Sequence, residues 1–144
     1  MSLKDGSKKM SKSELSDLSR INLTDSKDEM INKIKKAKTD SLPIPETTGE
    51  LDKRLEAKNL IGIYASLTNS TLDKSLEIFV GKNFSEFKEK LSQVLVDKID
   101  PISLEIKKLL NDKSYLDQIL LEGVEKADLI ASNKIKKIKE IIGF

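Results

Sequence analysis

The chain contains no cysteine, histidine or tryptophan, and these absences exclude several kinds of chemistry. Without cysteine it can form no disulfide and no thiolate nucleophile, and without histidine it has no Ser-His-Asp triad and no imidazole ligand for a metal. Helix breakers are scarce, with 6 Gly and 3 Pro, and the aromatic side chains are limited to 4 Phe and 2 Tyr. A sequence poor in breakers and in strand-favouring aromatics predicts an all-α fold.

Neither sign of charge dominates, and long hydrophobic runs are absent. The 144 residues carry 26 basic and 24 acidic side chains, for a net charge of +2, and 38% are hydrophobic. No stretch reaches the roughly 18 apolar residues that span a bilayer, and the charged first residues lack the apolar core of a secretory signal. We therefore expect a soluble, cytoplasmic chain that forms one folded unit without membrane contact.

Hydrophobic periodicity predicts a bundle of about five to six helices behind a flexible N-terminal segment. Ser26 and Glu29 form a capping-box pattern, which places the first helix at 27–38. The next helix is expected at 57–67, followed by a short helix that carries Leu72, Leu76 and Phe79 with Gly81 as its C-terminal cap, and by a longer helix behind Asn83. Pro101 is expected to bend the last of these without ending it, because the apolar pattern continues in phase.

Beyond this helix, the polar residues 111–114 predict a turn, with Ser114 as the cap of the next helix. Gly123 is expected to interrupt or bend that helix. The final helix, at 124–142, is expected to direct five small or apolar residues toward a core: Ala127, Ile130, Ala131, Ile138 and Ile141.

Residues 9–13 read Lys-Met-Ser-Lys-Ser, within the string DGSKKMSKS of residues 5–13. This KMSKS string resembles the second signature of the class I aminoacyl-tRNA synthetases, a loop that closes over ATP in that family. Nucleotidyl transfer needs positive charge directed at the leaving phosphate oxygens, and a flexible ammonium supplies it. The likeness continues in KIKKAKTDS at 33–41, in LEAKNLIGIY at 55–64 and in the final IGF. Together these segments look like the tryptophanyl members of the family.

The resemblance implies a role for each residue of the KMSKS string. Lys9 and Lys12 would act in catalysis by contacting the ATP phosphates, Met10 would lie near the adenine through its backbone, and Ser11 and Ser13 would support loop closure. It also implies ATP as a substrate, with Mg²⁺ that no residue of this chain holds. The implied partners are tRNA(Trp), tryptophan and, in the full-length family, a second copy in a homodimer.

A complete member of that family begins with a Rossmann-type half that carries a HIGH-like motif and the tryptophan pocket, and nothing in this sequence resembles it. We interpret the chain as the C-terminal part, with a KMSKS segment at 1–23 and a helical anticodon-binding domain at 24–144. We expect that it cannot form the adenylate alone and that its KMSKS loop is disordered without ATP. The apolar face at 60–67 is expected to be exposed and to promote self-association.

Contacts to tRNA are expected from basic side chains and from exposed rings. The lysine candidates lie in the first helix: Lys33, Lys35, Lys36 and Lys38. A second basic cluster, more readily explained as solvated surface, lies in the last helix: Lys134, Lys136, Lys137 and Lys139. The candidate stacking rings are Tyr64, Tyr115, Phe84, Phe87 and Phe144. Among the rings, Phe79, Phe84 and Phe87 have the spacing of core residues. Asp40 could accept from a base edge, but the cap of a turn is favoured.

A different class of function stays open, that of a free-standing helical RNA-binding or interaction module without ATP chemistry. A membrane-surface helix at 134–142 is a weaker third reading, because aromatic anchors are scarce there. Acidic pairs such as Asp28–Glu29 are explained by the helix dipole, and we expect no metal site.

Overall fold

The computed structural model describes residues 1–143. Within this range the chain has six α-helices, one short 3-10 turn and no strands, which confirms the all-α prediction. The chain divides into two compact units, of which the first comprises Met1–Leu104 and the second begins at Glu105. None of the described helices has an apolar stretch long enough to cross a membrane.

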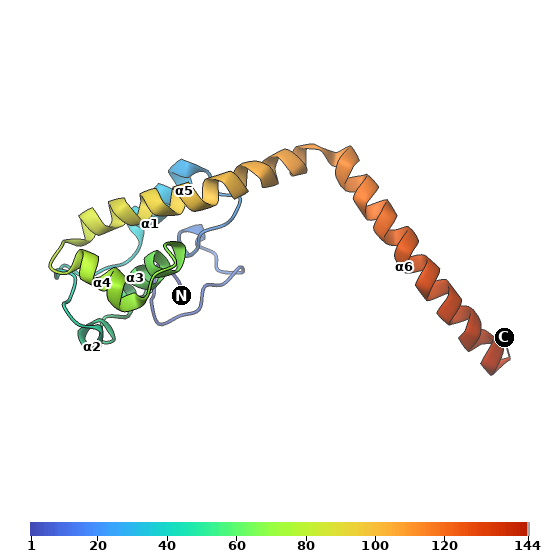
Figure 1. The fold of residues 1–144 in the computed structure, drawn as a ribbon, viewed down its shortest axis with the longest axis horizontal. Coiled ribbons are helices and arrows are strands. Elements are labelled where there is room, and N and C mark those ends of the chain that lie inside the picture. Colours follow the sequence, from blue (N-terminus) through green and yellow to red (C-terminus); the bar gives the residue numbers. More distant parts are fainter. Residues whose placement is uncertain (144) are drawn as a thin grey trace. The chain divides into compact units, whose positions relative to one another are not determined.

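The first unit holds the N-terminal segment, four helices and most of a fifth (Figure 1). The helices are α1 (Lys27–Lys36), α2 (Thr48–Leu51), α3 (Leu55–Leu67), α4 (Leu72–Phe79) and α5 (Phe84–Asn111). The predicted capping box of α1 is present in full, because Ser26 and Glu29 each accept from the other's backbone N–H. Asn83 caps α5 by accepting from the Glu86 N–H at 2.9 Å. These N-terminal caps define where each helix begins and therefore which of the following residues lie on its apolar face.

The core of the first unit is a cluster of aromatic rings between α3, α4 and α5. The Phe79 ring lies edge-on to Tyr64, with centroids 4.9 Å apart, and edge-on to Phe87, at 4.8 Å. Phe84 is buried beside them, which confirms the core positions predicted for Phe79, Phe84 and Phe87. Tyr64 is buried as well, so its ring is not available to stack on a base as the sequence had suggested.

The face of α3 expected to be exposed is instead central to this core. Leu60 and Ile61 are almost completely buried, and Ile63 and Leu67 pack against the core while partly exposed. The prediction of an open apolar face at 60–67 was wrong because the N-terminal segment and α4 supply apolar partners for it. Leu3, from the N-terminal segment that the sequence predicted to be flexible, is a core residue with 2% of its surface exposed.

In the second unit, α6 (Lys113–Ile142) is a single helix that continues through Gly123. The predicted interruption was wrong, because one glycine costs a helix only about 1 kcal/mol and its neighbours here favour helix. Asp112, not Ser114, is the cap, accepting from the Tyr115 N–H at 3.1 Å, while the Ser114 hydroxyl donates to Asp112. Upstream, α5 passes through Pro101 without ending, as predicted.

No residue of α6 is buried. The five residues predicted to face a core are therefore exposed: Ala127, Ile130, Ala131, Ile138 and Ile141. The prediction was wrong because periodicity identifies the apolar face of a helix but not what covers it.

Candidate functional site

The KMSKS string lies on a loop whose two ends are joined at the core. The N–H of Leu3 donates to the Ser19 carbonyl at 2.9 Å, and the N–H of Lys38 donates to the Leu3 carbonyl at 2.8 Å. A second hydrogen bond, from the Ser2 N–H to the Lys8 carbonyl at 2.8 Å, joins the two ends of the segment just before the string. The loop therefore starts from a fixed base beside the end of α1.

Before the string, a compact turn packs against the start of α3. Asp5 accepts from the backbone N–H and the hydroxyl of Ser7, at 3.0 and 2.6 Å. These hydrogen bonds from Ser7 hold the pKa of Asp5 below its ordinary value. Gly6 approaches α3 so closely that a Cβ atom there would lie 2.5 Å from the backbone carbonyl of Leu55. Glycine is the residue that permits this contact.

Within the string itself, the cationic side chains point to solvent. Lys9, Lys12 and Ser13 are exposed, whereas Met10 and Ser11 are half-buried. The hydroxyls of Ser11 and Ser13 lie 3.1 Å apart and share a hydrogen bond. The loop thus presents two ammonium groups and two hydroxyls, a set of donors that suits an anionic oxygen ligand such as phosphate.

Arg20 connects this loop to the residues that follow it. Its guanidinium donates to the carbonyls of Ser11, at 3.4 Å, and Glu14, at 3.0 Å. It also contacts Asp17 at 3.0 Å and the Asn22 side chain at 3.3 Å. One side chain therefore bonds two backbone carbonyls of the loop and two polar groups beyond it.

Lys33, expected from the sequence to contact tRNA, is instead buried in an ionic cluster. Its ammonium lies 2.7 Å from the buried carboxylate of Asp25 and also bonds Asp17. Although burial by itself lowers the pKa of Lys33, the hydrogen bonds that its ammonium donates to Asp17 and Asp25 outweigh this effect and raise the pKa above its ordinary value. The same contact with Lys33 holds the pKa of Asp17 down. Both partners of Lys33 are therefore carboxylates that precede α1, Asp17 in the 3-10 turn and Asp25 just before the helix.

The other lysines of the first cluster do not share one surface. Lys35 and Lys36 are exposed, and of these Lys35 lines a groove between α1 and α5. Lys38 is exposed and pairs with Glu56 at 2.8 Å, a contact that raises the pKa of Lys38. In the second unit, the predicted basic cluster on α6 is exposed: Lys134, Lys136, Lys137 and Lys139.

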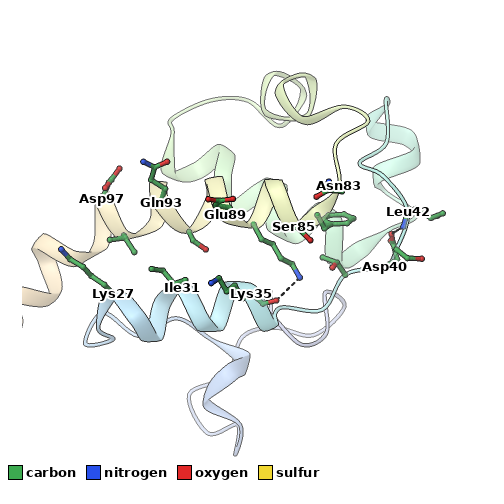
Figure 2. A pocket seen from close by; sticks show the side chains of 16 residues that line it. Lys27, Ile31, Lys35, Asp40, Leu42, Asn83, Ser85, Glu89, Gln93 and Asp97 are labelled. Atoms are coloured by element: carbon green, nitrogen blue, oxygen red, sulfur yellow. Dashed lines mark hydrogen bonds between the residues drawn. The ribbon is translucent and has the colours of Figure 1, made fainter.

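The groove between α1 and α5 has a volume of about 1070 Å³. Figure 2 shows Lys27, Ile31 and Lys35 along α1, opposite Glu89 and Gln93 of α5. The groove is thus lined by charged and amide side chains over a partly apolar floor.

Lys88 and Ser92 also contribute polar groups to the groove. The Lys88 ammonium donates to the carbonyl of Ala37 at 2.6 Å, at the end of α1, and its burial lowers its pKa. Ser92 is 95% buried, since 5% of its surface is exposed, and its hydroxyl has no hydrogen-bond partner among the described residues. A buried hydroxyl without a partner is costly and marks a place where a ligand or water can bond.

One end of the groove is formed by a loop that Arg54 holds in place. Asp40 accepts from Arg54 at 2.8 Å, which lowers the pKa of Asp40, and it accepts from the Leu42 N–H at 3.0 Å. Arg54 also donates to the carbonyls of Pro43 and Leu42, and its guanidinium lies 5.5 Å from the centre of the Phe84 ring. Asp40 thus stabilises the turn, as favoured from the sequence.

Of the candidate stacking rings, Tyr115 on α6 is exposed, with 48% of its surface accessible. Tyr64, Phe84 and Phe87 are buried, and Phe144 lies outside the described residues. Among the described residues, no group of three or more carboxylates gathers as a ligand set for a metal.

Sequence reasoning did not single out Gly6, Arg20, Arg54, Lys88 or Ser92. One signal was available, because Arg20 and Arg54 are the only arginines among 26 basic side chains. Arginine supplies several donors in a rigid fork, so an isolated arginine in a lysine-rich chain indicates a multidentate contact. Gly6 and Ser92 give no such signal, because their roles depend on residues distant in sequence.

Comparison with known proteins places these features in a family. The family model for class I tRNA synthetases (W and Y) matches residues 1–98. The tryptophan–tRNA ligase of Caulobacter vibrioides is 46% identical over 144 residues, which cover 100% of this chain and 42% of that protein. That of Agrobacterium fabrum is 48% identical, with 100% and 41% covered. The chain therefore spans about two fifths of the length of these curated relatives.

A solved structure gives the same result for the fold. The crystal structure of tryptophanyl-tRNA synthetase from Mycoplasma pneumoniae superposes with a TM-score of 0.68 at 24% identity, covering 100% of this chain and 45% of that chain. Because the family model covers more than half of the sequence, including the KMSKS string, the chain belongs to the class I tRNA synthetases of the tryptophan and tyrosine family.

Proposed function

We propose that the chain acts as part of a tryptophan–tRNA ligase, which joins tryptophan to tRNA(Trp) through an adenylate made from ATP. The observation that carries the proposal is the KMSKS string, exposed on a loop with a fixed base. Its similarity to tryptophan–tRNA ligases along the whole chain supports the choice of amino acid.

In this proposal, the loop stabilises the negative charge that develops when the tryptophan carboxylate attacks the α-phosphate of ATP and pyrophosphate leaves. Lys9 and Lys12 place ammonium groups at the phosphate oxygens, and the hydroxyls of Ser11 and Ser13 donate hydrogen bonds as the loop closes. Met10 contacts the adenine through its backbone. Mg²⁺ enters with ATP as part of the substrate.

We assign tRNA binding to the groove between α1 and α5. Lys35 supplies positive charge for phosphates, and the buried hydroxyl of Ser92 supplies a hydrogen bond for a base or sugar. Lys36 and Lys38 add phosphate contacts beside the groove, whereas Lys33 has a structural role. The tryptophan pocket is assigned to the part of the relatives that this chain does not match, so the chain alone is expected to form no adenylate.

The ATP role is tested by titrating the chain with inorganic pyrophosphate and with MgATP. Replacement of both Lys9 and Lys12 by alanine is expected to weaken pyrophosphate binding, while a double replacement of Lys134 and Lys136, which removes the same charge, leaves it unchanged. Equal losses in the two variants would mean that only net charge matters. Tryptophan-dependent ATP–pyrophosphate exchange by the chain alone would contradict the assignment of the tryptophan pocket.

The RNA role is tested by measuring binding to tRNA(Trp) and to the same tRNA with an altered anticodon across a salt series. Lys35→Ala is compared with Lys134→Ala, because both side chains are exposed but only Lys35 lines the groove. Anticodon preference that persists at high salt, together with a loss of affinity in Lys35→Ala that the Lys134 variant lacks, supports the groove. Equal, salt-sensitive binding to both tRNAs favours the alternative of a helical module with phosphate affinity only.

A further inference from the structure

Among the described residues, Arg20 is the one side chain from outside residues 9–15 that hydrogen-bonds the backbone of this part of the KMSKS loop. Its guanidinium donates to the carbonyls of Ser11 and Glu14, which lie on either side of Lys12. The other hydrogen bonds within residues 9–15 are local: the Glu14 N–H donates to the Ser11 carbonyl at 3.5 Å, and the hydroxyls of Ser11 and Ser13 lie 3.1 Å apart. The conformation around Lys12 therefore depends on Arg20 more than on the loop's own contacts.

The guanidinium is itself held in place by the rest of the unit. Asp17 contacts Arg20 at 3.0 Å and also bonds Lys33, whose ammonium is buried against Asp25. Asn22 accepts from the Arg20 Nε and donates to Asp17 at 3.0 Å. Because Lys33 belongs to α1, these contacts join the loop to a helix of the core.

We propose that Arg20 is a positioning residue that fixes the KMSKS loop so that Lys9 and Lys12 face a phosphate ligand. The inference rests on the proposed function of the loop. Four of the five N–H donors of Arg20 are used by loop carbonyls, Asp17 and Asn22, so its proposed role is to hold the loop and not to bind the ligand. Its effect is to reduce the conformational freedom that the lysines lose when phosphate binds.

The role requires arginine, because a single ammonium cannot bond two carbonyls, a carboxylate and an amide from one position. Arg54 provides an internal comparison. It bonds the carbonyls of Leu42 and Pro43 and the carboxylate of Asp40, and so holds the loop at the end of the groove in the same way. A variant of Arg54 therefore tests whether an effect on the KMSKS loop is specific to Arg20.

The experiment measures backbone ¹⁵N relaxation of the whole chain and its affinity for inorganic pyrophosphate by NMR titration. If Arg20 orders the loop, residues 11–14 of the wild-type chain have order parameters of about 0.85 without ATP, contrary to the disorder expected from the sequence, and in Arg20→Ala these values fall below about 0.6. Pyrophosphate affinity is expected to fall roughly tenfold, which corresponds to a loop that holds its binding conformation about one tenth as often. Arg20→Lys, which keeps the charge, gives an intermediate result. Arg54→Ala changes the relaxation of residues 40–43 but not of 11–14.

Unchanged order parameters at residues 11–14 in Arg20→Ala would overturn the proposal. So would a mobile loop with undiminished pyrophosphate affinity, since positioning would then be unnecessary. If the NMR signals of Lys9 and Lys12 in the wild-type chain do not shift on addition of pyrophosphate, the proposed function is contradicted. The relaxation data still decide in that case whether Arg20 orders the loop. Thermal melting of each variant by circular dichroism identifies unfolding, and Arg20→Lys serves as the readout if the alanine variant does not fold.

Discussion

Replacing Gly6 by alanine is expected to push the start of the KMSKS loop away from α3. The added Cβ would lie 2.5 Å from the carbonyl carbon and oxygen of Leu55 and 2.6 Å from the N of Glu56. These atoms are backbone, so no side-chain rotation relieves the overlap. Forcing an extra methyl into a packed site costs about 1–3 kcal/mol. If the segment detaches instead, burial of Leu3 is lost, at a similar cost of about 1.5–3 kcal/mol.

The matched control is Gly62→Ala, the same substitution in the middle of α3. Apart from the neighbouring residues and backbone of α3 itself, no atom lies within 4 Å of a Cβ built at Gly62, and alanine in a helix interior is about 0.5–1 kcal/mol better than glycine. Urea and thermal unfolding, followed by circular dichroism, should therefore show shifts of opposite sign. For a unit of this size, each kcal/mol corresponds to about 4–8 °C in Tm. A Gly6 variant as stable as the wild type would refute the close-contact reasoning.

Three further predictions concern the ionic and polar groups. Lys33→Met leaves the buried carboxylate of Asp25 without its cation, and urea unfolding should show a loss of about 3–5 kcal/mol, against almost none if the cluster were solvated. The folded-state pKa values of Asp17 and Asp40 lie below the ordinary 3.8, so their contribution to stability is present above that pH and is lost as the pH falls through the folded values. Acid titration of the melting temperature should therefore show a fall below about pH 4 that is smaller in the two Asn variants; identical curves would exclude the linkage. Ser92→Ala removes a buried hydroxyl without a partner and should leave stability unchanged or raise it by up to about 1 kcal/mol, yet weaken tRNA binding; unaltered affinity would remove Ser92 from the groove's function.

The features predicted well from the sequence are those set by neighbouring residues. Ser26 and Glu29 cap α1 because the two partners stand one turn apart, and Phe79 and Phe87 are core residues because their helices have apolar faces at those positions. The KMSKS string is contiguous, so its identification needed no tertiary information. Its exposure on a surface loop followed from the polar residues around it.

The features that were missed depend on contacts between distant segments. Lys33 has the same local surroundings as Lys35 and Lys36, but only Lys33 turns toward Asp25. The close approach of Gly6 to Leu55 joins residues about fifty positions apart and leaves no periodic pattern. The same holds for α6. Its helical spacing of apolar residues was predicted correctly, but the prediction that these residues are buried was wrong.

One consequence follows from the two faces of α1. Ile31 and Lys35 line the groove assigned to tRNA, whereas Lys33 on another face bonds Asp17, which in turn holds Arg20 at the KMSKS loop. The ten residues of α1 form a rigid rod, so a small translation or rotation of the helix moves both faces together. If tRNA docks in the groove as proposed and shifts α1, the KMSKS loop would move with the helix through the contacts of Lys33, Asp17 and Arg20.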